Sequence, residues 1–293
     1  MRSRYTRRVI GRRIAVVGAG GFIGRHLVSR LESLGYSTLI LGSADSDTIQ
    51  SNHFWSDNPV EAIVWLASKI TPTIAESDPQ LVEMEIAEFS SFLRSAEQGR
   101  QKIIFASSGG TVYSGQDCPF NEESPARGVN AYGRAKVQME MLANQSLLEN
   151  VNLRIANAYG PGQRIDRGQG VIASWANSVL NEMPIKVFGS LSVSRDFVYI
   201  DDVVTAIVNV ISAELSEETL NIGSGKATSL NEILDELEKV SRRRIAIQEL
   251  ARRGVDRESM WLDISKAKKL IHWEPKVGFS QGIEMTWNSL EIG

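Results

Sequence analysis

The chain has 293 residues, of which 42% are hydrophobic and 23% charged, values that are ordinary for a globular protein of one large or two modest domains. Its net charge of -3 argues against a nucleic-acid partner, and no apolar run reaches the ~20 residues that a membrane span needs. Cys118 is the single cysteine and the three histidines are scattered, so we expect no disulfide, no metal site and a reducing cytoplasm.

The first residues, MRSRYTRRVIGRR, are rich in arginine. We expect residues 1–12 to form a basic tail outside the fold, with a basic arm for an anionic partner as the alternative. No apolar stretch of the secretory type follows this segment before the first predicted strand.

Short apolar runs alternate with amphipathic stretches along the first half of the chain. The runs are RIAVVGAG, STLIL, EAIVWLAS, KIIFASS and VNLRIAN, and they are apolar on both faces, as buried parallel strands are. FIGRHLVSRLESLG and LVEMEIAEFSSFLRSAEQG, between them, have helical periodicity. The alternation predicts a doubly wound parallel α/β sheet over residues 13–160. Because the pattern weakens after about residue 160, we expect residues 161–293 to form a smaller mixed α/β domain.

A glycine-rich turn, VVGAGGFIG, follows the first predicted strand and begins the first predicted helix. Gly18, Gly21 and Gly24 would let the backbone turn tightly and approach a pyrophosphate, whose charge the helix N-terminus favours. An acidic residue that would hold a ribose 2′-hydroxyl is missing at the end of the second strand, at Gly42–Ser43. The choice between NAD and NADP therefore stays open.

Tyr132 and Lys136 are four residues apart in the predicted helix AYGRAKVQMEM. This spacing puts both side chains on one helical face, one turn apart. A lysine ammonium beside a phenol favours the phenolate, which makes the pair suited to acid/base chemistry near neutral pH. An ordinary Tyr/Lys pair on a wet helix is the alternative.

Eight segments in this order resemble the extended short-chain dehydrogenase/reductases of the nucleotide-sugar epimerase/dehydratase type. They are GAGGFIG, LAS, SSGGTVYS, YGRAK, LRIANAYGPGQ, RDFVYIDDV, LNIGSG and WLDISKAKKLIHWEP. The resemblance implies a Rossmann dinucleotide-binding domain at residues 13–160 and a nucleotide-sugar-binding domain at residues 161–293. It also implies a homodimer formed by the helix around Phe89 to Leu93 and the Tyr132 helix.

The resemblance implies a role for single residues. Tyr132 would exchange a proton with the sugar, and Lys136 would bond the nicotinamide ribose. The cofactor, NAD or NADP, would contact Gly18, Gly21, Phe22, Ile23, Gly24, Ser43, Leu66, Ala67, Ser107, Tyr132, Lys136 and Tyr159. The nucleotide-sugar substrate would contact Thr111, Asn157, Arg195 and Arg253. The alternatives are a salt bridge of Arg195 with Asp196 or Asp202, and a solvated face for Arg253.

The catalytic Ser or Thr of the family usually lies three residues before the valine of VY, and here that position is Gly109. Ser108 and Thr111 are the nearest substitutes, and water is a third. Since a strand alternates its faces, a shift of one residue points a side chain the other way unless the Gly-Gly bend re-aims it. We expect a weakened or rebuilt site, with Ser108 as the candidate catalytic hydroxyl.

Two further departures concern the reaction. Glu85 aligns where relatives often have an asparagine, and the segment between STLIL and EAIVWLAS is short, as in 4-keto-sugar reductases that use NADPH. The favoured hypothesis is an NAD-dependent 4-epimerase of a nucleotide-activated hexose. The alternatives are an NADPH-dependent nucleotide 4-keto-6-deoxy-sugar reductase, and a catalytically weakened NAD(P)-binding module that serves regulation.

Overall fold

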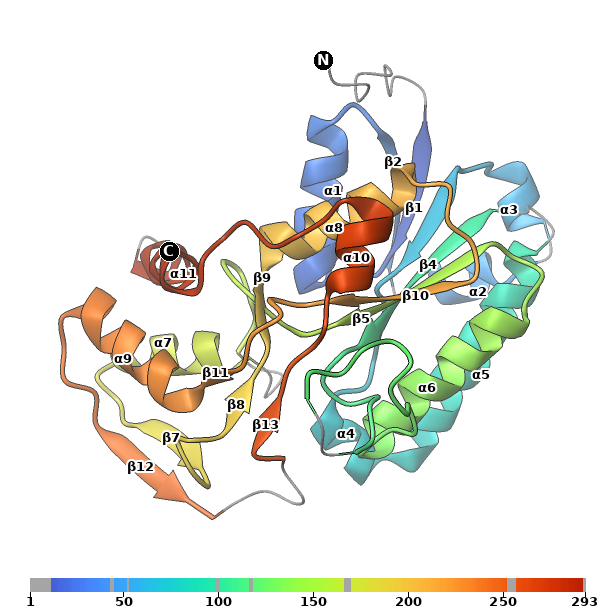
Figure 1. Cartoon of the computed structure of the whole chain (residues 1–293). Helices are drawn as coiled ribbons and strands as arrows, with labels where there is room; N and C mark the ends of the chain where they lie inside the picture. Colours follow the sequence, from blue (N-terminus) through green and yellow to red (C-terminus); the bar gives the residue numbers. More distant parts are fainter. Residues whose placement is uncertain are drawn as a thin grey trace.

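The computed structural model describes residues 12–42, 45–51, 53–97, 101–115, 118–165, 170–251 and 257–291. At its centre lies a six-stranded sheet with the strand order β10-β5-β4-β3-β1-β2, in which all neighbours are parallel (Figure 1). The strands are β1 (Arg13–Val17), β2 (Ser37–Leu41), β3 (Ala62–Trp65), β4 (Lys102–Ser108), β5 (Asn150–Ile155) and β10 (Glu218–Ile222). This arrangement confirms the doubly wound parallel sheet.

Strand β2 departs from the expectation that every strand is buried on both faces. It forms the edge of the sheet, and the side chain of Ile40 within it is 57% exposed. The central strands β1 and β3 are buried along nearly their whole length, because helices cover both faces there.

Two pairs of helices cover the sheet. Helices α1 (Phe22–Ser33) and α8 (Ile200–Ser212) pack together on one face, and α5 (Pro79–Ala96) and α6 (Ala131–Gln145) pack together on the other. The shorter helices near the sheet are α2 (Ser46–Ile49), α3 (Phe54–Asp57), α4 (Pro72–Ser77) and α10 (Ser265–Ile271). Between β2 and β3 the described residues hold α2 and α3 and no further strand, as the shortness of that segment predicts.

In the described ranges, the second part of the molecule contains helices and small sheets. The helices are α7 (Val171–Leu180), α9 (Leu230–Ser241) and α11 (Phe279–Glu291). The paired strands are β6 (Asn157–Tyr159) with β9 (Phe197–Tyr199), β7 (Ile185–Phe188) with β12 (Ile247–Leu250), and β8 (Ser194–Arg195) with both β11 (Thr228–Ser229) and β13 (Ser259–Met260).

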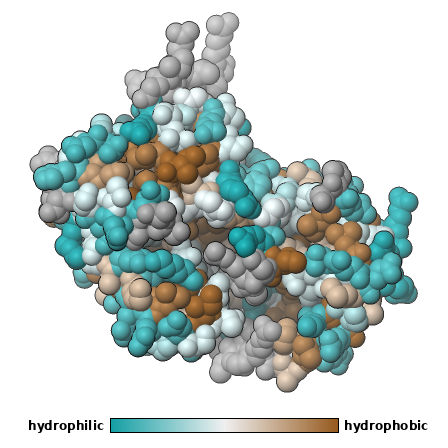
Figure 2. All heavy atoms as spheres, turned by 180° about the vertical axis from the view of Figure 1, so that it is seen from behind, coloured by the Kyte–Doolittle hydropathy of each residue, from teal (hydrophilic) through white to brown (hydrophobic). Residues whose placement is uncertain are grey.

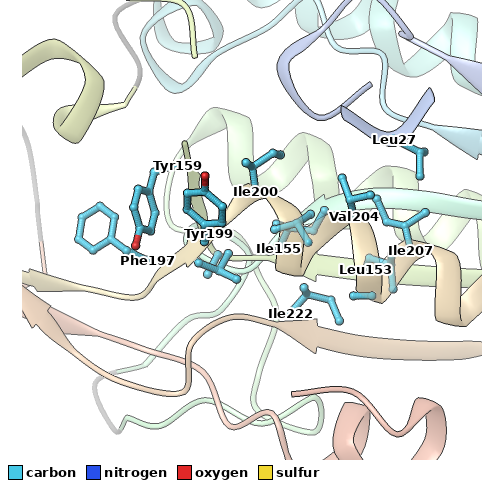
Figure 3. Close-up of a cluster of buried hydrophobic side chains, with 14 of the residues drawn as sticks. Leu27, Leu153, Ile155, Tyr159, Phe197, Tyr199, Ile200, Val204, Ile207 and Ile222 are labelled. Atoms are coloured by element: carbon cyan, nitrogen blue, oxygen red, sulfur yellow. The ribbon is translucent and has the colours of Figure 1, made fainter. Parts of the chain in front are cut away.

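The single boundary expected near residue 160 is too simple. Helix α8 and strand β10 both follow that residue in the chain, yet α8 packs on α1 and β10 pairs with β5. The chain therefore leaves the large sheet after β5, enters the second part, and returns. A continuous hydrophobic core accompanies this return (Figure 3), running from Leu153 and Ile207 to Tyr159 and Phe197.

A separate cluster of buried side chains lies beneath α5 and α6 and includes Phe89, Phe92 and Phe105. On the face of the molecule opposite to that in Figure 1, hydrophobic side chains form separate patches among hydrophilic ones (Figure 2). None of the helices in the described ranges has both the length and the apolar composition needed to cross a membrane.

Candidate active site

The glycine turn forms a cradle between β1 and α1. Gly18 has a φ of +91°, and a Cβ there would lie 2.6 Å from the backbone nitrogen of Ala67. At the helix start, the N-cap Gly21 forms no side-chain capping bond, and a Cβ at Gly20 would meet no atom within 4 Å. The open side of the turn thus offers backbone amides at a helix N-terminus, the surroundings that a pyrophosphate requires. The residues present fit a dinucleotide.

The other expected cofactor contacts lie near this cradle. Phe22 and Ile23 begin α1, and Leu66 and Ala67 follow β3 directly beside Gly18. Ser43 lies outside the described residues. The amide of Gly42 donates to the carboxylate of Asp45 at 2.8 Å, so the first acidic residue after β2 folds back on the strand end.

Tyr132 and Lys136 lie on one face of α6, which begins after the N-cap Asn130. The Asn130 side chain accepts a hydrogen bond of 2.8 Å from the amide of Gly133 and so defines the first turn of the helix. Lys136 is only 2% exposed, and its Nζ lies 5.5 Å from the centroid of the Tyr132 ring. The ammonium is therefore close to the phenol in a largely dry environment.

Glu85 of α5 also contacts Lys136. Its Oε1 lies 3.6 Å from the Lys136 Nζ. The carboxylate also accepts hydrogen bonds from Ser68 Oγ and from the amides of Lys69 and Ile70. The residue that aligns with an asparagine of relatives is thus a buried ion-pair partner of the lysine.

The two candidate hydroxyls are hydrogen-bonded to each other, Thr111 Oγ1 donating to Ser108 Oγ at 2.9 Å. A side chain at Gly109 would point away from these hydroxyls and into filled space. Its Cβ would lie 2.6 Å from a methyl carbon of Leu262 and 2.9 Å from the carbonyl oxygen of Arg154. The Gly-Gly bend brings the Thr111 backbone against Gly133, the neighbour of Tyr132. The structure therefore presents hydroxyls at Ser108 and Thr111 and leaves no room for a side chain at Gly109.

The Ser107 hydroxyl is engaged in a buried network. It donates to Glu140 Oε1 at 2.5 Å, and Glu140 also accepts from the guanidinium of Arg154, with 2.7 Å between Oε2 and Nη2. The bonds and charge of Glu140 raise the pKa of Arg154 although burial opposes the shift. Sequence reasoning missed the ion pair of Glu140 and Arg154. Its signal in the sequence is a charged residue at an inward-facing position of α6 and another at such a position of β5.

Tyr159 and Asn157 are both tied to the second part of the molecule. The Tyr159 side chain is 2% exposed, and its hydroxyl donates to the carbonyl of Phe279 at 3.3 Å. This side chain therefore belongs to the core, and only its backbone is left to approach a cofactor. The exposed Asn157 donates through Nδ2 to the carbonyl of Asp196 at 2.8 Å.

Arg195 of β8 contacts Arg257, which lies just before β13. Arg195 Nη1 donates to the carbonyl oxygen of Arg257 at 3.0 Å. Arg257 donates to the carbonyl of Tyr113 at 2.6 Å and stacks on Phe120, with 5.1 Å from Cζ to the ring centroid. Burial, followed by the charge of Arg195, lowers the pKa of Arg257 although Cys118 opposes the shift.

The Nη1 of Arg257 is buried and has no hydrogen-bond partner in the described structure. Two adjacent guanidinium groups, one with an orphaned donor, are suited to an anion such as a diphosphate. Arg253 lies outside the described residues. Asp196 and Asp202, the carboxylates considered as partners of Arg195, accept backbone amides instead: Ser224, Gly225 and Leu262 for Asp196, and Lys276 and Val277 for Asp202. Arg257 is the arginine of the ARRGVDRES run that sequence reasoning missed.

A parallel sheet with a glycine turn after β1, and a Tyr/Lys pair with a buried lysine on the helix after β4, defines a dinucleotide-dependent protein of the short-chain dehydrogenase type. Residues 14–223 match the model of the NAD dependent epimerase/dehydratase family, and the chain belongs to this family.

Among similar proteins, a dTDP-4-dehydro-6-deoxyglucose reductase of Escherichia coli is 30% identical, over 94% of this chain and 97% of the relative. A putative UDP-glucose 4-epimerase of Methanocaldococcus jannaschii is 31% identical over the same shares of the two chains. The crystal structure of a Thermotoga maritima UDP-glucose 4-epimerase with UDP-glucose superposes with a TM-score of 0.89 at 27% identity, over 96% of this chain and 99% of that one.

Proposed function

We propose that the chain catalyses hydride transfer at C4 of a nucleotide-activated hexose, and that the reaction is 4-epimerisation. The observation that supports this proposal most directly is the buried Lys136 ammonium beside Tyr132. Both residues lie on a helix that contacts the turn bearing Ser108 and Thr111. Similar proteins named as UDP-glucose 4-epimerases support this reading.

The residues divide the chemistry as follows. The turn at Gly18 and the start of α1 would hold the pyrophosphate of a dinucleotide, whose nicotinamide would supply the acceptor and donor of the C4 hydride. Tyr132 takes the proton of the O4 hydroxyl as the C4–H bond breaks, and it gives the proton back after the keto-sugar has turned. Ser108, supported by Thr111, donates a hydrogen bond to the same oxygen. Arg195 and Arg257 bind the diphosphate, and the role predicted for Arg253 stays a prediction.

A second candidate, reduction of a nucleotide 4-keto-6-deoxy sugar, is favoured by separate observations. Asp45 is bonded to Gly42 at the end of β2, and the described part of the crossover to β3 holds the two short helices α2 and α3. Neither feature places an acidic side chain where it would bind the ribose 2′-hydroxyl and so select NAD. The Escherichia coli relative named as a 4-keto reductase agrees with this candidate.

The decisive experiment begins with the cofactor. Freshly purified protein is denatured, and the released nucleotide is identified by mass spectrometry. Stoichiometric NAD, together with interconversion of UDP-glucose and UDP-galactose, is the result expected of an epimerase, since the cofactor is regenerated in each turnover. An empty protein that binds NADPH and consumes it with a 4-keto sugar nucleotide identifies a reductase.

The Tyr132→Phe variant separates both reactions from a regulatory module. Loss of turnover with unchanged cofactor binding is the expected result for either enzyme. A wild-type protein that binds the cofactor but turns over neither class of substrate would contradict the proposal.

We further propose a homodimer through the outward faces of α5 and α6. Phe89, Phe92 and Leu93 are buried within the chain itself, so they are not available to a partner. The exposed apolar side chains of these helices are those of Met84 and Met141, at 55% and 54%.

A further inference from the structure

Glu85 is a buried carboxylate inside the candidate active site that has no part in the hydride-transfer scheme. Its side chain is 4% exposed and that of Lys136 is 3% exposed, with 3.6 Å between Oε1 and Nζ. In a site this dry, the interaction of two charges is much stronger than at the surface. The role inferred for Glu85 rests on the function proposed for Tyr132 and Lys136.

The position of the Glu85 carboxylate is determined by the backbone of the turn after β3. Oε2 accepts from the amide of Lys69 at 2.6 Å and from the amide of Ile70 at 3.1 Å, and Oε1 accepts from Ser68 Oγ at 2.8 Å. These three donors hold the Glu85 carboxylate at a fixed place against Lys136.

The other charged groups around this pair are already matched. Lys69, from the turn after β3, pairs with Glu88 of α5 at 2.5 Å. Glu76 of α4 accepts a hydrogen bond from the amide of Ala131, at the start of α6. Glu85 is therefore the anion that faces the Lys136 ammonium, whose Nζ also lies 5.3 Å from the Phe105 ring centroid.

We propose that Glu85 is a positioning residue that holds Lys136 beside Tyr132 and offsets the charge of its ammonium group. A lone ammonium would favour the phenolate, whereas an ion pair of zero net charge favours it much less. The balance between phenolate, the base of the oxidative half of the reaction, and phenol, the proton donor of the reductive half, then depends on Glu85. In the reductive half the phenol proton passes to the carbonyl oxygen as the hydride forms the new C4–H bond.

A titration without substrate tests this role. The ultraviolet absorbance of the phenolate is followed against pH, and the curve of the matching Tyr132→Phe protein is subtracted to isolate Tyr132. Burial raises the pKa of Tyr113 and of Tyr199 to about 12, so these phenols ionise outside the window of interest. Glu85→Gln should lower the midpoint for Tyr132 by about one pH unit, the size of shift that an uncompensated neighbouring charge produces.

Matched variants identify the cause. Glu88→Gln removes the same charge from the same helix but beside Lys69, and it should leave the midpoint in place. Glu85→Asp keeps the charge and should stay close to the wild-type midpoint. The double variant Glu85→Gln/Lys136→Met removes both charges and should return the midpoint to near the wild-type value, and it replaces a buried ion pair by uncharged groups if the single variant fails to fold.

A midpoint that stays in place or rises in Glu85→Gln would overturn the proposal. The titration does not depend on turnover, so an inactive wild-type protein would count against the proposed function and leave this result to be judged separately. With turnover, the pH–rate profile for carbonyl reduction should lose activity at lower pH in Glu85→Gln than in wild type.

Discussion

Thr111 donates its hydroxyl proton to the Oγ of Ser108 across 2.9 Å. This bond occupies one acceptor position of Ser108 and is compatible with the serine donating its own proton to a substrate oxygen. A hydroxyl is therefore present at the end of β4 although Gly109 occupies the position at which the sequence pattern places it.

Ser108→Ala should lower kcat about a hundredfold, as loss of one donor to a developing oxyanion does. Thr111→Val removes only the supporting bond and should lower kcat about tenfold. Steady-state kinetics with the nucleotide-sugar substrate measure both values. Equal activity of Ser108→Ala and wild type would assign the role to water or to Thr111.

Gly109→Ala should destabilise the fold by about 1–3 kcal/mol, since the added methyl group overpacks a closed site. The new Cβ would lie 2.6 Å from Leu262 Cδ1 and 2.9 Å from the Arg154 carbonyl oxygen. Gly110→Ala is the matched control, because its Cβ would meet only the Met260 Cε at 3.8 Å. Urea unfolding measures the stability of both variants. Equal unfolding midpoints for Gly109→Ala and Gly110→Ala would contradict the packing seen around Gly109.

Stability should fall as the pH rises above 10. Burial raises the pKa of Tyr113 from 10.0 to about 12, and its hydroxyl donates to Asn221 Oδ1 at 2.5 Å. Between these values the unfolded chain binds fewer protons than the folded one, so unfolding becomes more favourable with pH. In Tyr113→Phe the slope of the unfolding free energy against pH should be smaller by ~1.4 kcal/mol per pH unit over this window. Identical slopes in denaturant titrations would refute this assignment.

Arg257→Ala should weaken the binding of UDP about ten- to a hundredfold, the effect of removing a hydrogen bond to a charged group. Isothermal titration calorimetry with UDP measures the change. Arg244→Ala is the control, because the Arg244 side chain is 96% exposed and pairs with Glu238. If Arg257→Ala binds UDP as wild type does, its orphaned Nη1 serves no diphosphate.

Met141→Lys should weaken the proposed homodimer about a hundredfold, as loss of a central apolar anchor does. Met183→Lys is the control: Met183 lies after α7 and is similarly exposed, at 51% against 54% for Met141. Sedimentation velocity compares the two variants with wild type. A wild-type protein that is monomeric at micromolar concentration argues against the dimer itself.

The sequence by itself determined the parts of the molecule whose signals are local. The alternation of apolar runs and amphipathic stretches predicted the strands β1 to β5 and the helices α1, α5 and α6, and the family motifs predicted the class of protein. The Tyr132 and Lys136 spacing is also local, because one helical turn decides it. The glycine turn after β1 belongs to the same group, since strand, turn and helix are contiguous in the chain.

Only the tertiary structure decided which distant residues meet. The order of strands places α5 beside α6, and this neighbourhood brings Glu85 to Lys136. The return of the chain to β10 beside β5 was likewise not visible, because strand pairing depends on contacts between segments far apart in the chain. Contacts between distant segments also explain why Leu262 closes the Gly109 position. They explain as well why Arg257 is a neighbour of Arg195. Periodicity within an element encodes which face is buried, but the partner of that face is chosen by the packing of the whole chain.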